Sequence, residues 1–251
     1  MTMLPSVSVL VVTRDRPALL ADALDSVVAQ DPHPLEVRVG DDGGGGSAPV
    51  GEQFPLLELT WLSLVCGQAG AARNAAAAGA RGDVLAFLDD DDRWRPTHLA
   101  GLAAAFRDPA VGFAWRDSEV VRERLTPEGG RVDLERRTLA RDWDDAVMRS
   151  DDYLPPSAWG VRRSLFESLG GFDASFRFSE DWDFVLRAAR VTRLQRVPGL
   201  TVEVRLRDSG NASSDFGSER LDCLQRLAER HGFATPSPKT FWEVALAVGA
   251  A

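Results

Sequence analysis

The sequence feature that most constrains the fold is a run of four apolar residues that leads directly into four aspartates. The apolar residues are Leu85–Leu88 and the acids are Asp89–Asp92. A short apolar run entered from Gly82-Asp83 is typical of a buried strand in a parallel sheet. Open α/β sheets bind their ligands at the carboxyl ends of the strands. The sequence therefore predicts four carboxylates at the ligand-binding edge of such a sheet.

Four adjacent carboxylates repel one another strongly unless a cation lies among them, because a divalent ion reverses the local electrostatics. Carboxylate oxygens are hard ligands and favour Mg²⁺ or Mn²⁺ over zinc. Asp89–Asp92 therefore indicate a divalent metal site. The alternative is a solvated acidic turn that caps a helix beginning near Pro96.

Strand and helix patterns alternate along the first part of the chain. The expected strands are Val7–Val12, Leu35–Val39, Leu57–Val65 and Val84–Leu88, and the expected helices begin at Pro17 and cover Ala69–Arg81. Strand, helix and strand in succession form a right-handed βαβ unit by default. We therefore expect an α/β fold with a mixed, mostly parallel central sheet flanked by helices.

The second part of the chain mixes shorter patterns. Strands are expected over residues 111–115, 119–124, 157–161, 194–197 and 201–206. Helices are expected over 97–106, 163–169, 219–231 and 241–251, and another is opened by residues 178–183 and runs through 189. The polar residues 133–156 predict a mobile or loosely helical segment over a site. No repeat or interdomain linker interrupts the pattern, so residues 1–251 are expected to form one domain.

Composition excludes some classes of partner and location. The net charge of −9 disfavours binding to nucleic acid or to an anionic membrane surface. The two cysteines, Cys66 and Cys223, are far apart and lack metal-ligand spacing, which fits a reduced cytoplasmic protein. The sequence contains no apolar run of membrane-spanning length and no signal peptide, so no transmembrane segment is expected.

Three acidic clusters each follow an expected strand or open an expected helix: Asp41-Asp42, Asp89–Asp92 and Glu180-Asp181. Acids at the strand ends of one sheet converge on one crevice, whereas charge that serves solubility is spread over the surface. The run Gly43–Gly46 would let backbone approach a ligand closely, or would be only a flexible loop. It lacks the Lys and Ser/Thr of a phosphate-binding P-loop.

Several segments, in the right order over about residues 7–215, resemble the motifs of family 2 glycosyltransferases. Two stretches resemble the amino-terminal signature of the family, namely Val7–Pro17 and Val39–Gly43. Ala71–Asn74 followed by Phe87–Asp92 is similar to the family's paired helix and DxD motifs. Gly170–Asp173 and Glu180-Asp181 resemble the acceptor-side motifs of the family.

This resemblance implies an A-type glycosyltransferase fold with a Rossmann-like nucleotide-binding half, about residues 1–95, fused to an acceptor-binding half, about residues 96–251. It implies inverting transfer of a sugar from a nucleoside-diphosphate sugar, with UDP the commonest nucleotide, to an acceptor that the sequence does not identify. The chain lacks the Gln-x-x-Arg-Trp pattern of processive synthases, which favours transfer of a single sugar. A homodimer is compatible with the sequence, which does not determine the oligomeric state.

The resemblance also assigns donor-binding roles by motif position. The positions that match donor-binding residues are Thr13, Asp15, Asp42, Arg73, Asp89, Asp90 and Glu180. Asp42 matches the residue that binds the base, and Asp41 beside it faces the ribose or caps a turn. Asp15 is alternatively only a helix N-cap, and Arg73 is alternatively a surface arginine of its helix.

The metal and the base come from different segments. Asp91 matches the direct ligand of Mg²⁺ or Mn²⁺, with Asp89 as the other acid of the DxD motif, whereas Asp92, like Asp90, would contact the donor sugar or support the ligands. Asp208 stands where the family usually carries a histidine and is a further candidate ligand. Asp181 matches the general base, and Trp182 beside it would stack on a sugar or lie in the core.

Two other functions remain open. A sugar-phosphate nucleotidyltransferase expects a Gly-rich loop with Arg or Lys directly after the first strand, whereas this chain has Thr13–Pro17 there. A non-catalytic nucleotide-sugar-binding module would not need the acid at position 181.

Overall fold

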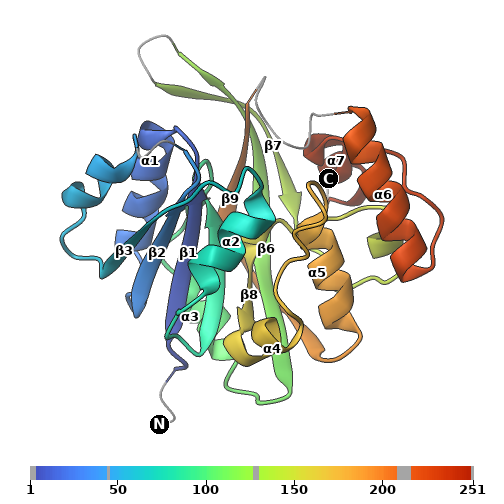
Figure 1. Cartoon of the computed structure of the whole chain (residues 1–251), viewed down its shortest axis with the longest axis horizontal. Helices are drawn as coiled ribbons and strands as arrows, with labels where there is room; N and C mark the ends of the chain where they lie inside the picture. The colour runs from blue at the N-terminus through green and yellow to red at the C-terminus, as the bar shows by residue number, and fades with distance from the viewer. Residues whose placement is uncertain (1–3, 44–45, 127–129, 208–215, 250–251) are drawn as a thin grey trace.

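The computed structural model describes residues 4–43, 46–126, 130–207 and 216–249. Its strands form one nine-stranded sheet in the order β3-β2-β1-β4-β8-β6-β9-β5, with β7 paired to β6 off this path. Helices flank the sheet (Figure 1), so the predicted mixed α/β class is confirmed.

The amino-terminal strands of the sheet are all parallel. They are β1 (Val7–Thr13), β2 (Glu36–Asp41), β3 (Leu59–Ser63) and β4 (Val84–Asp89). In the register of these pairs Thr13 lies beside Asp41, and Val12 lies beside Asp89. The acids at positions 41 and 89 therefore leave the sheet at the same edge, as expected from their places at strand ends.

The remaining strands extend this sheet with mixed directions. They are β5 (Arg93–Trp94), β6 (Val111–Leu125), β7 (Arg131–Leu139), β8 (Trp159–Arg162) and β9 (Arg193–Arg207). Strand β8 runs antiparallel between β4 and β6, whereas β9 runs parallel to β6. Because β6 and β9 therefore run in the same direction as β4, their carboxyl ends approach the edge that carries the acids.

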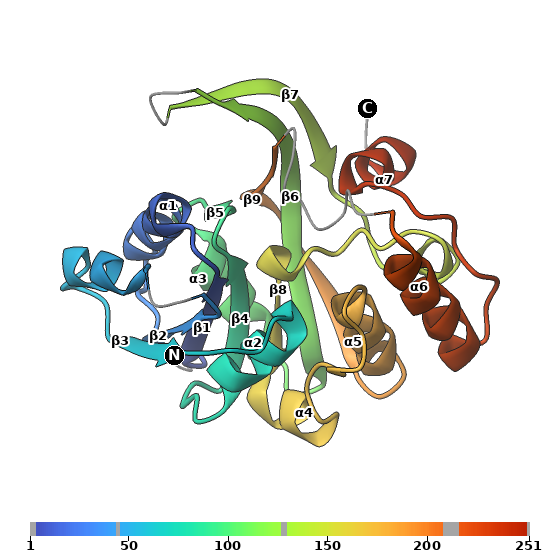
Figure 2. The ribbon, with the colours of Figure 1, turned by 45° about the horizontal axis from the view of Figure 1, so that its top comes forward.

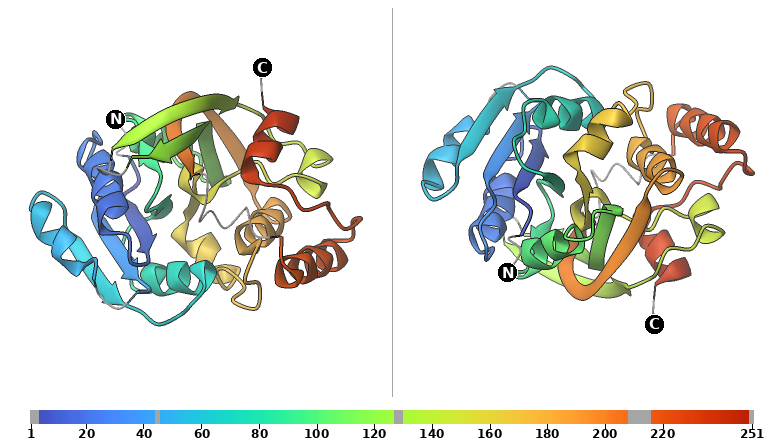
Figure 3. Two further views of the ribbon diagram at one scale, coloured as in Figure 1. Left: turned by 90° about the horizontal axis from the view of Figure 1, so that it is seen from above. Right: turned by 90° about the horizontal axis from the view of Figure 1, so that it is seen from below.

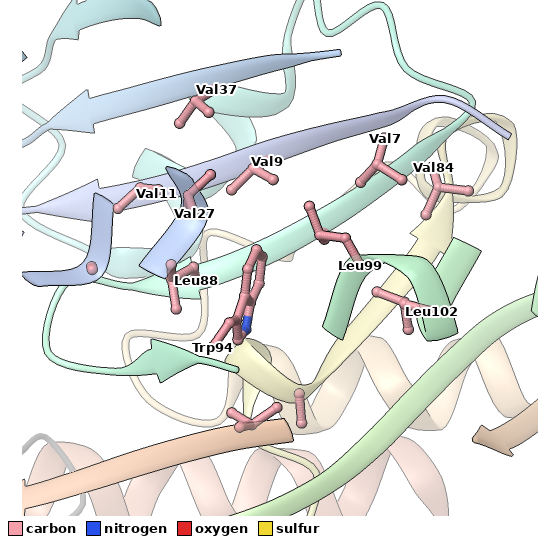
Figure 4. Packing of buried hydrophobic residues seen from close by; sticks show 14 of the residues in the cluster. Val7, Val9, Val11, Val27, Val37, Val84, Leu88, Trp94, Leu99 and Leu102 are labelled. Carbon is pink, nitrogen blue, oxygen red and sulfur yellow. The ribbon is translucent and has the colours of Figure 1, made fainter. Parts of the chain in front are cut away.

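Two apolar cores fill the opposite faces of the sheet. One lies under α1 (Pro17–Val28) and α3 (His98–Ala105), and the other under α2 (Ala69–Ala77), α4 (Arg163–Ser168), α5 (Glu180–Ala189) and α6 (Ser218–His231). Figure 4 shows the first core, with Val11 of β1 beside Val27 of α1 and Val9 nearer to Leu99 of α3. Alternate residues of β1 therefore face different cores, as a strand buried on both faces requires.

The last helix, α7 (Phe241–Val248), packs on β6 and β7. Seen from above, α1 and β3 lie on one side of the central strands and α5, α6 and α7 lie on the other (Figure 3). Figure 2 shows β6 and β7 as a long curved hairpin that projects beyond the rest of the sheet. Over the described residues, no helix combines the length and apolar character needed to cross a bilayer.

Three expectations for the second half were wrong. The strands predicted separately over 111–115 and 119–124 are one strand, β6, and those predicted over 194–197 and 201–206 are one strand, β9. Both strands continue through the interruptions because the register between them shifts near Arg116-Asp117 instead of breaking. The start of residues 133–156, predicted to be mobile or loosely helical, belongs to β7, whose polar side chains pair with those of β6.

Candidate active site

One cavity of about 660 Å³ lies between the carboxyl ends of the strands and the helices of the second half. Its walls include two of the three acidic clusters predicted to converge, namely Asp89–Asp92 and Glu180-Asp181. They also include Arg16, Arg73, Asp152, Arg205 and Lys239. Residues far apart in the sequence thus form one charged cleft, with the aspartate quartet at one end and the start of α5 at the other.

Arg73 joins the two acidic clusters. Its Nη2 donates to Asp89 Oδ1 at 2.6 Å and its Nη1 donates to Glu180 Oε1 at 2.8 Å. Burial alone lowers the pKa of Arg73, but the carboxylates of Asp89, Glu180 and Asp181 raise it above its ordinary value. The side chain is buried, so the alternative of a surface arginine is wrong. This bridge holds Asp89 and Glu180 at the two Nη atoms of one guanidinium.

Alternate aspartates of the quartet point into the protein. Asp90 and Asp92 are only 2% and 4% exposed. Asp90 Oδ2 accepts from Thr13 Oγ1 at 2.7 Å, and Asp92 Oδ1 accepts from the backbone N–H of Arg205 at 2.9 Å. Burial and the neighbouring Asp91 raise the pKa of Asp90 to about 7. These two acids therefore fix the turn after β4 to β1 and β9.

The acidic-turn alternative is wrong on two counts. Asp90 and Asp92 are buried rather than solvated. The N-cap of α3 is Thr97, and no side chain caps that helix.

The other two aspartates face the cavity. The side chains of Asp89 and Asp91 are 27% and 19% exposed. Asp91 Oδ2 accepts from Arg16 Nη1 at 3.0 Å and from Arg207 Nη2 at 2.7 Å. Burial and Asp89 raise the pKa of Asp91, while Arg16 and Arg207 lower it. Arg16, the N-cap of α1, and Arg207, at the end of β9, thus neutralise Asp91, whereas Asp89 is paired with Arg73.

Asp89 and Asp91 fit a hard divalent cation. Within the described residues, no group of three or more His, Cys, Asp or Glu side chains is arranged to hold a metal. Mg²⁺ is commonly bound through one or two carboxylates together with substrate phosphates and water, so two cavity-facing carboxylates are a sufficient protein share. The third predicted ligand, Asp208, lies outside the described residues.

Glu180 and Asp181 lie in the first turn of α5. That helix begins after Ser179, whose φ of 64° is left-handed. Burial and Asp181 raise the pKa of Glu180 to about 7, against the effect of Arg73. Burial also raises the pKa of Asp181, while Arg73 and the N–H of Trp182 lower it. The helix dipole favours negative charge at this end. The turn at Ser179 therefore places both acids where the dipole partly offsets the effect of burial.

Two hydrogen-bond networks fix α5 relative to α2. Besides the Arg73 bridge, the side chain of Asn74 donates to Phe172 O at 2.8 Å and accepts from Phe172 N at 2.9 Å. Arg187 of α5 donates to Gly171 O at 2.8 Å and to Asp183 at 2.7 Å. A Cβ on Gly171, whose φ is 69°, would lie 2.5 Å from Asn74 Oδ1. The Gly-Gly-Phe-Asp motif therefore positions the helix that carries Asp181.

Asp152 is a cavity acid that sequence reasoning missed. It lies between the short helices Val147–Arg149 and Pro156–Ala158. Burial, followed by the charge of Asp181, raises its pKa well above the ordinary value. The polar composition of this segment predicted only a mobile or loosely helical stretch over a site, and the placement of Asp152 near Asp181 in the cavity identifies this acid.

Trp182 packs as a core residue. It is buried, its Nε1 donates to Met148 O at 2.8 Å, and it stacks on Phe233.

The residues predicted to bind the nucleotide lie beside the cavity at the ends of β1 and β2. The carboxylate of Asp42 accepts from the backbone N–H groups of Cys66 and Gly67, and Gly67 itself lines the cavity. Asp41 is buried and accepts from Gly43 N at 3.1 Å, the geometry of a turn cap. Thr13 is buried against Asp90 and does not line the cavity.

Asp15 is exposed and has a left-handed φ of 54°. A Cβ on residue 43 would lie 2.5 Å from Asp15 Oδ1, so glycine lets the two loops approach closely. The N-cap of α1 is Arg16, without a side-chain cap, and the alternative of Asp15 as N-cap is wrong.

The sequence and structure resemble those of known proteins. The family model described as glycosyl transferase family 2 matches residues 8–170. An uncharacterized glycosyltransferase, YwdF, of Bacillus subtilis (strain 168) is 34% identical over 94% of this chain and 87% of its own length.

Solved structures share the fold. S. aureus TarS 1–349 in complex with UDP-GlcNAc has a TM-score of 0.67 at 20% identity, covering 89% of this chain and 66% of that one. The mannosyltransferase PcManGT from Pyrobaculum calidifontis, in complex with GDP-Man and Mn²⁺, has a TM-score of 0.63 at 22% identity, covering 97% of this chain and 69% of that one. These neighbours confirm the predicted A-type glycosyltransferase fold.

Proposed function

Because the chain belongs to glycosyl transferase family 2, we propose that its cavity transfers one sugar, with inversion, from a nucleoside-diphosphate sugar to an acceptor. The observation that carries this proposal is the Arg73 bridge, which brings Asp89 and Glu180 from distant segments onto one guanidinium. Inverting transfer needs acids on two sides of the reacting carbon, and the bridge brings acids from two segments to one cavity.

The donor occupies the half of the cavity formed by residues 1–95. Asp42, Thr13 and Asp15 lie at the strand ends where the nucleotide would lie, with Asp42 as the contact for the base. Relatives of the fold support the ligand class, since TarS was solved with UDP-GlcNAc and PcManGT with GDP-Man. A UDP-sugar is our first candidate donor.

The diphosphate lies against Asp89 and Asp91. These two carboxylates would hold Mg²⁺ or Mn²⁺, and the cation, when bound, stabilises negative charge on the leaving diphosphate. Arg16 and Arg207, which pair with Asp91, stand next to the same position. Their guanidiniums are suited to bind phosphate oxygens once Asp91 is occupied.

Asp181 acts from the opposite wall as the general base. Inversion is a single displacement, so the acceptor hydroxyl attacks the anomeric carbon from the face away from the diphosphate. The proton of that hydroxyl passes to the carboxylate of Asp181, which burial makes more basic. Because Asp181 and Asp91 come from different segments, each acts on its own side of the reacting carbon.

The acceptor enters through residues 96–251. Asp152 and Asp181 both line this part of the cavity, and the charge of Asp181 raises the pKa of Asp152. Both carboxylates are hydrogen-bond acceptors suited to a hydroxyl-bearing acceptor.

Release of nucleoside diphosphate from a panel of nucleotide sugars tests this function. We expect purified protein with Mn²⁺ to release a nucleoside diphosphate from one donor class, by slow hydrolysis where no acceptor is supplied. Release of pyrophosphate from a nucleoside triphosphate and a sugar phosphate would instead identify a nucleotidyltransferase. Donor binding without turnover, even with acceptor candidates, would identify a binding module.

A further inference from the structure

Arg116 is a buried arginine without an acidic partner. It lies on β6 and is 8% exposed. In the part of the chain that the structure describes, its one hydrogen bond runs from Nε to Thr201 Oγ1 at 3.3 Å. Its Nη1 and Nη2 form no other hydrogen bond there, and both keep some contact with solvent although the side chain is largely buried.

The other buried arginines each bind acceptors of the protein through at least one Nη atom. Arg73 pairs with two carboxylates, and Arg205 contacts Glu123 at 2.8 Å among three acids. Arg38 donates to Ala76 O at 2.6 Å and to Ala78 O at 2.7 Å. A buried guanidinium that lacks such partners costs free energy. Arg116 therefore differs from them, because the Nη atoms of its guanidinium need an acceptor from outside the protein.

Two glycines hold the guanidinium in place. A Cβ on Gly101 of α3 would lie 1.5 Å from Arg116 Nη1, and one on Gly199 of β9 would lie 2.5 Å from Nη2. Any side chain at either position would force the arginine to move. The backbone of α3 and β9 thus forms a fitted slot around Nη1 and Nη2, which keep some contact with solvent.

Burial lowers the pKa of His98 well below its ordinary value, so the ring beside this slot is uncharged. The buried ring of His98 contacts Thr201 Oγ1 through Nδ1 at 3.0 Å, and its Nε2 has no partner. The nearest acid in sequence, Asp117, is already bound by Arg196 at 2.8 Å and by Gly199 N at 2.9 Å. Burial lowers the pKa of Arg116, and Asp117 only partly offsets this. No carboxylate is left in the described chain to neutralise the guanidinium.

We propose that Arg116, set between Gly101 and Gly199, is the centre of an oxyanion site that takes a phosphate or carboxylate group from solvent. The parallel N–H groups of Nη1 and Nη2 match two oxygens of such a group. The site lies on the α3 face of the sheet, and Arg116 is not among the residues that line the candidate active-site cavity. The inference does not rest on the proposed sugar transfer.

The test is thermal unfolding in inorganic phosphate, and separately in acetate, with ionic strength balanced by NaCl. At tenfold its dissociation constant, a bound anion should raise the midpoint by about 3–5 °C. The rise should persist in Arg16→Gln, which removes a cation from the active-site cavity, and should disappear in Arg116→Met. Equal rises in wild type and Arg116→Met would overturn the proposal.

A second measurement avoids the variants, in case Arg116→Met fails to fold. Crystals of the wild-type protein are soaked in selenate, a phosphate analogue whose selenium is located by anomalous scattering. A peak within hydrogen-bond distance of Nη1 or Nη2 of Arg116 supports the site. Peaks only at the active-site arginines, or none, would contradict it.

Discussion

The two ends of the cavity differ in how their acids are balanced. At the donor end, Asp89 and Asp91 are paired with Arg73, Arg16 and Arg207. At the acceptor end, neither Asp152 nor Asp181 has an arginine or lysine partner among the residues that the structure describes, and burial raises the pKa of both.

This difference separates two uses of a carboxylate. Arginine pairing favours the charged form, which suits acids that hold a cation or lie beside phosphates. An unpaired, desolvated carboxylate accepts a proton more readily, which suits a general base. Glu180 lies between the two ends, because it is bound to Arg73 and neighbours Asp181.

The largest expected effect is at the acceptor end. Asp181→Asn keeps the shape of the side chain but removes its ability to take a proton. We expect the rate of sugar transfer to fall by about 10²–10⁴-fold, measured with the donor that the nucleotide-sugar panel identifies. Asp145→Asn, which removes one acid of a surface pair with Arg149, should leave the rate unchanged. A rate within twofold of wild type would remove Asp181 from the base role.

Arg73→Met removes the bridge between the ends. It leaves the carboxylates of Asp89 and Glu180 partly buried without their cation, so the free energy of unfolding should fall by about 3–5 kcal/mol. The matched control is Arg149→Met, which loses only an exposed pair with Asp145 and should cost less than about 1 kcal/mol. Equal losses in urea unfolding would show that the bridge does not hold the two ends together.

The free energy of unfolding contributed by an acid outside the cavity should depend on pH in the opposite direction from that contributed by the acids inside it. Burial raises the pKa of Asp173, but hydrogen bonds with Ser175 and Arg230 outweigh it and bring the pKa to about 2. Because the folded pKa is below the ordinary 3.8, this stabilisation is present above pH 4 and is lost as pH falls toward 2. Asp173→Asn should therefore cost about 1–2 kcal/mol at pH 6 and progressively less below pH 4. A constant loss in urea unfolding over that range would contradict the linkage.

The smallest effect concerns the turn that begins α5. Ser179→Gly relieves the cost of a left-handed φ in a residue with a Cβ but increases the freedom of the unfolded chain. The net gain should be about 0.5 kcal/mol. Ser164→Gly, in the right-handed helix α4, should instead lose about 0.5 kcal/mol. Unfolding midpoints that fall in both variants would show that the turn at 179 is unstrained.

The sequence predicted most of the sheet and the ends of the cavity. Apolar runs such as Val7–Val12 and Leu85–Leu88 have one reasonable conformation, and acids that follow parallel strands must leave at one edge. Asp89 could therefore be placed at the ligand-binding edge, whereas Asp181, which opens a helix, was placed in the same site by the resemblance to family 2 glycosyltransferases. The predicted helix bounds differ from the observed ones by only a few residues. For example, α4 ends just before Gly170 and Gly171, as expected.

The parts that were missed depend on contacts across the sheet. Strand β7 is polar and exposed on much of its length, so its pairing with β6 has no apolar signature. Arg16 and Arg207 become partners of Asp91 only because β1, β4 and β9 end at the same edge. Asp152 carries no motif, and its place opposite Asp181 follows from the path of the chain between β7 and β8.

The division of labour between the ends is tested most directly by nucleotide binding with and without Mn²⁺. Calorimetry would compare wild type, Asp91→Asn and Asp181→Asn, using the nucleoside diphosphate of the active donor. We predict that Mn²⁺ strengthens binding in wild type and Asp181→Asn but not in Asp91→Asn. Loss of the Mn²⁺ effect in Asp181→Asn, or its persistence in Asp91→Asn, would contradict the account.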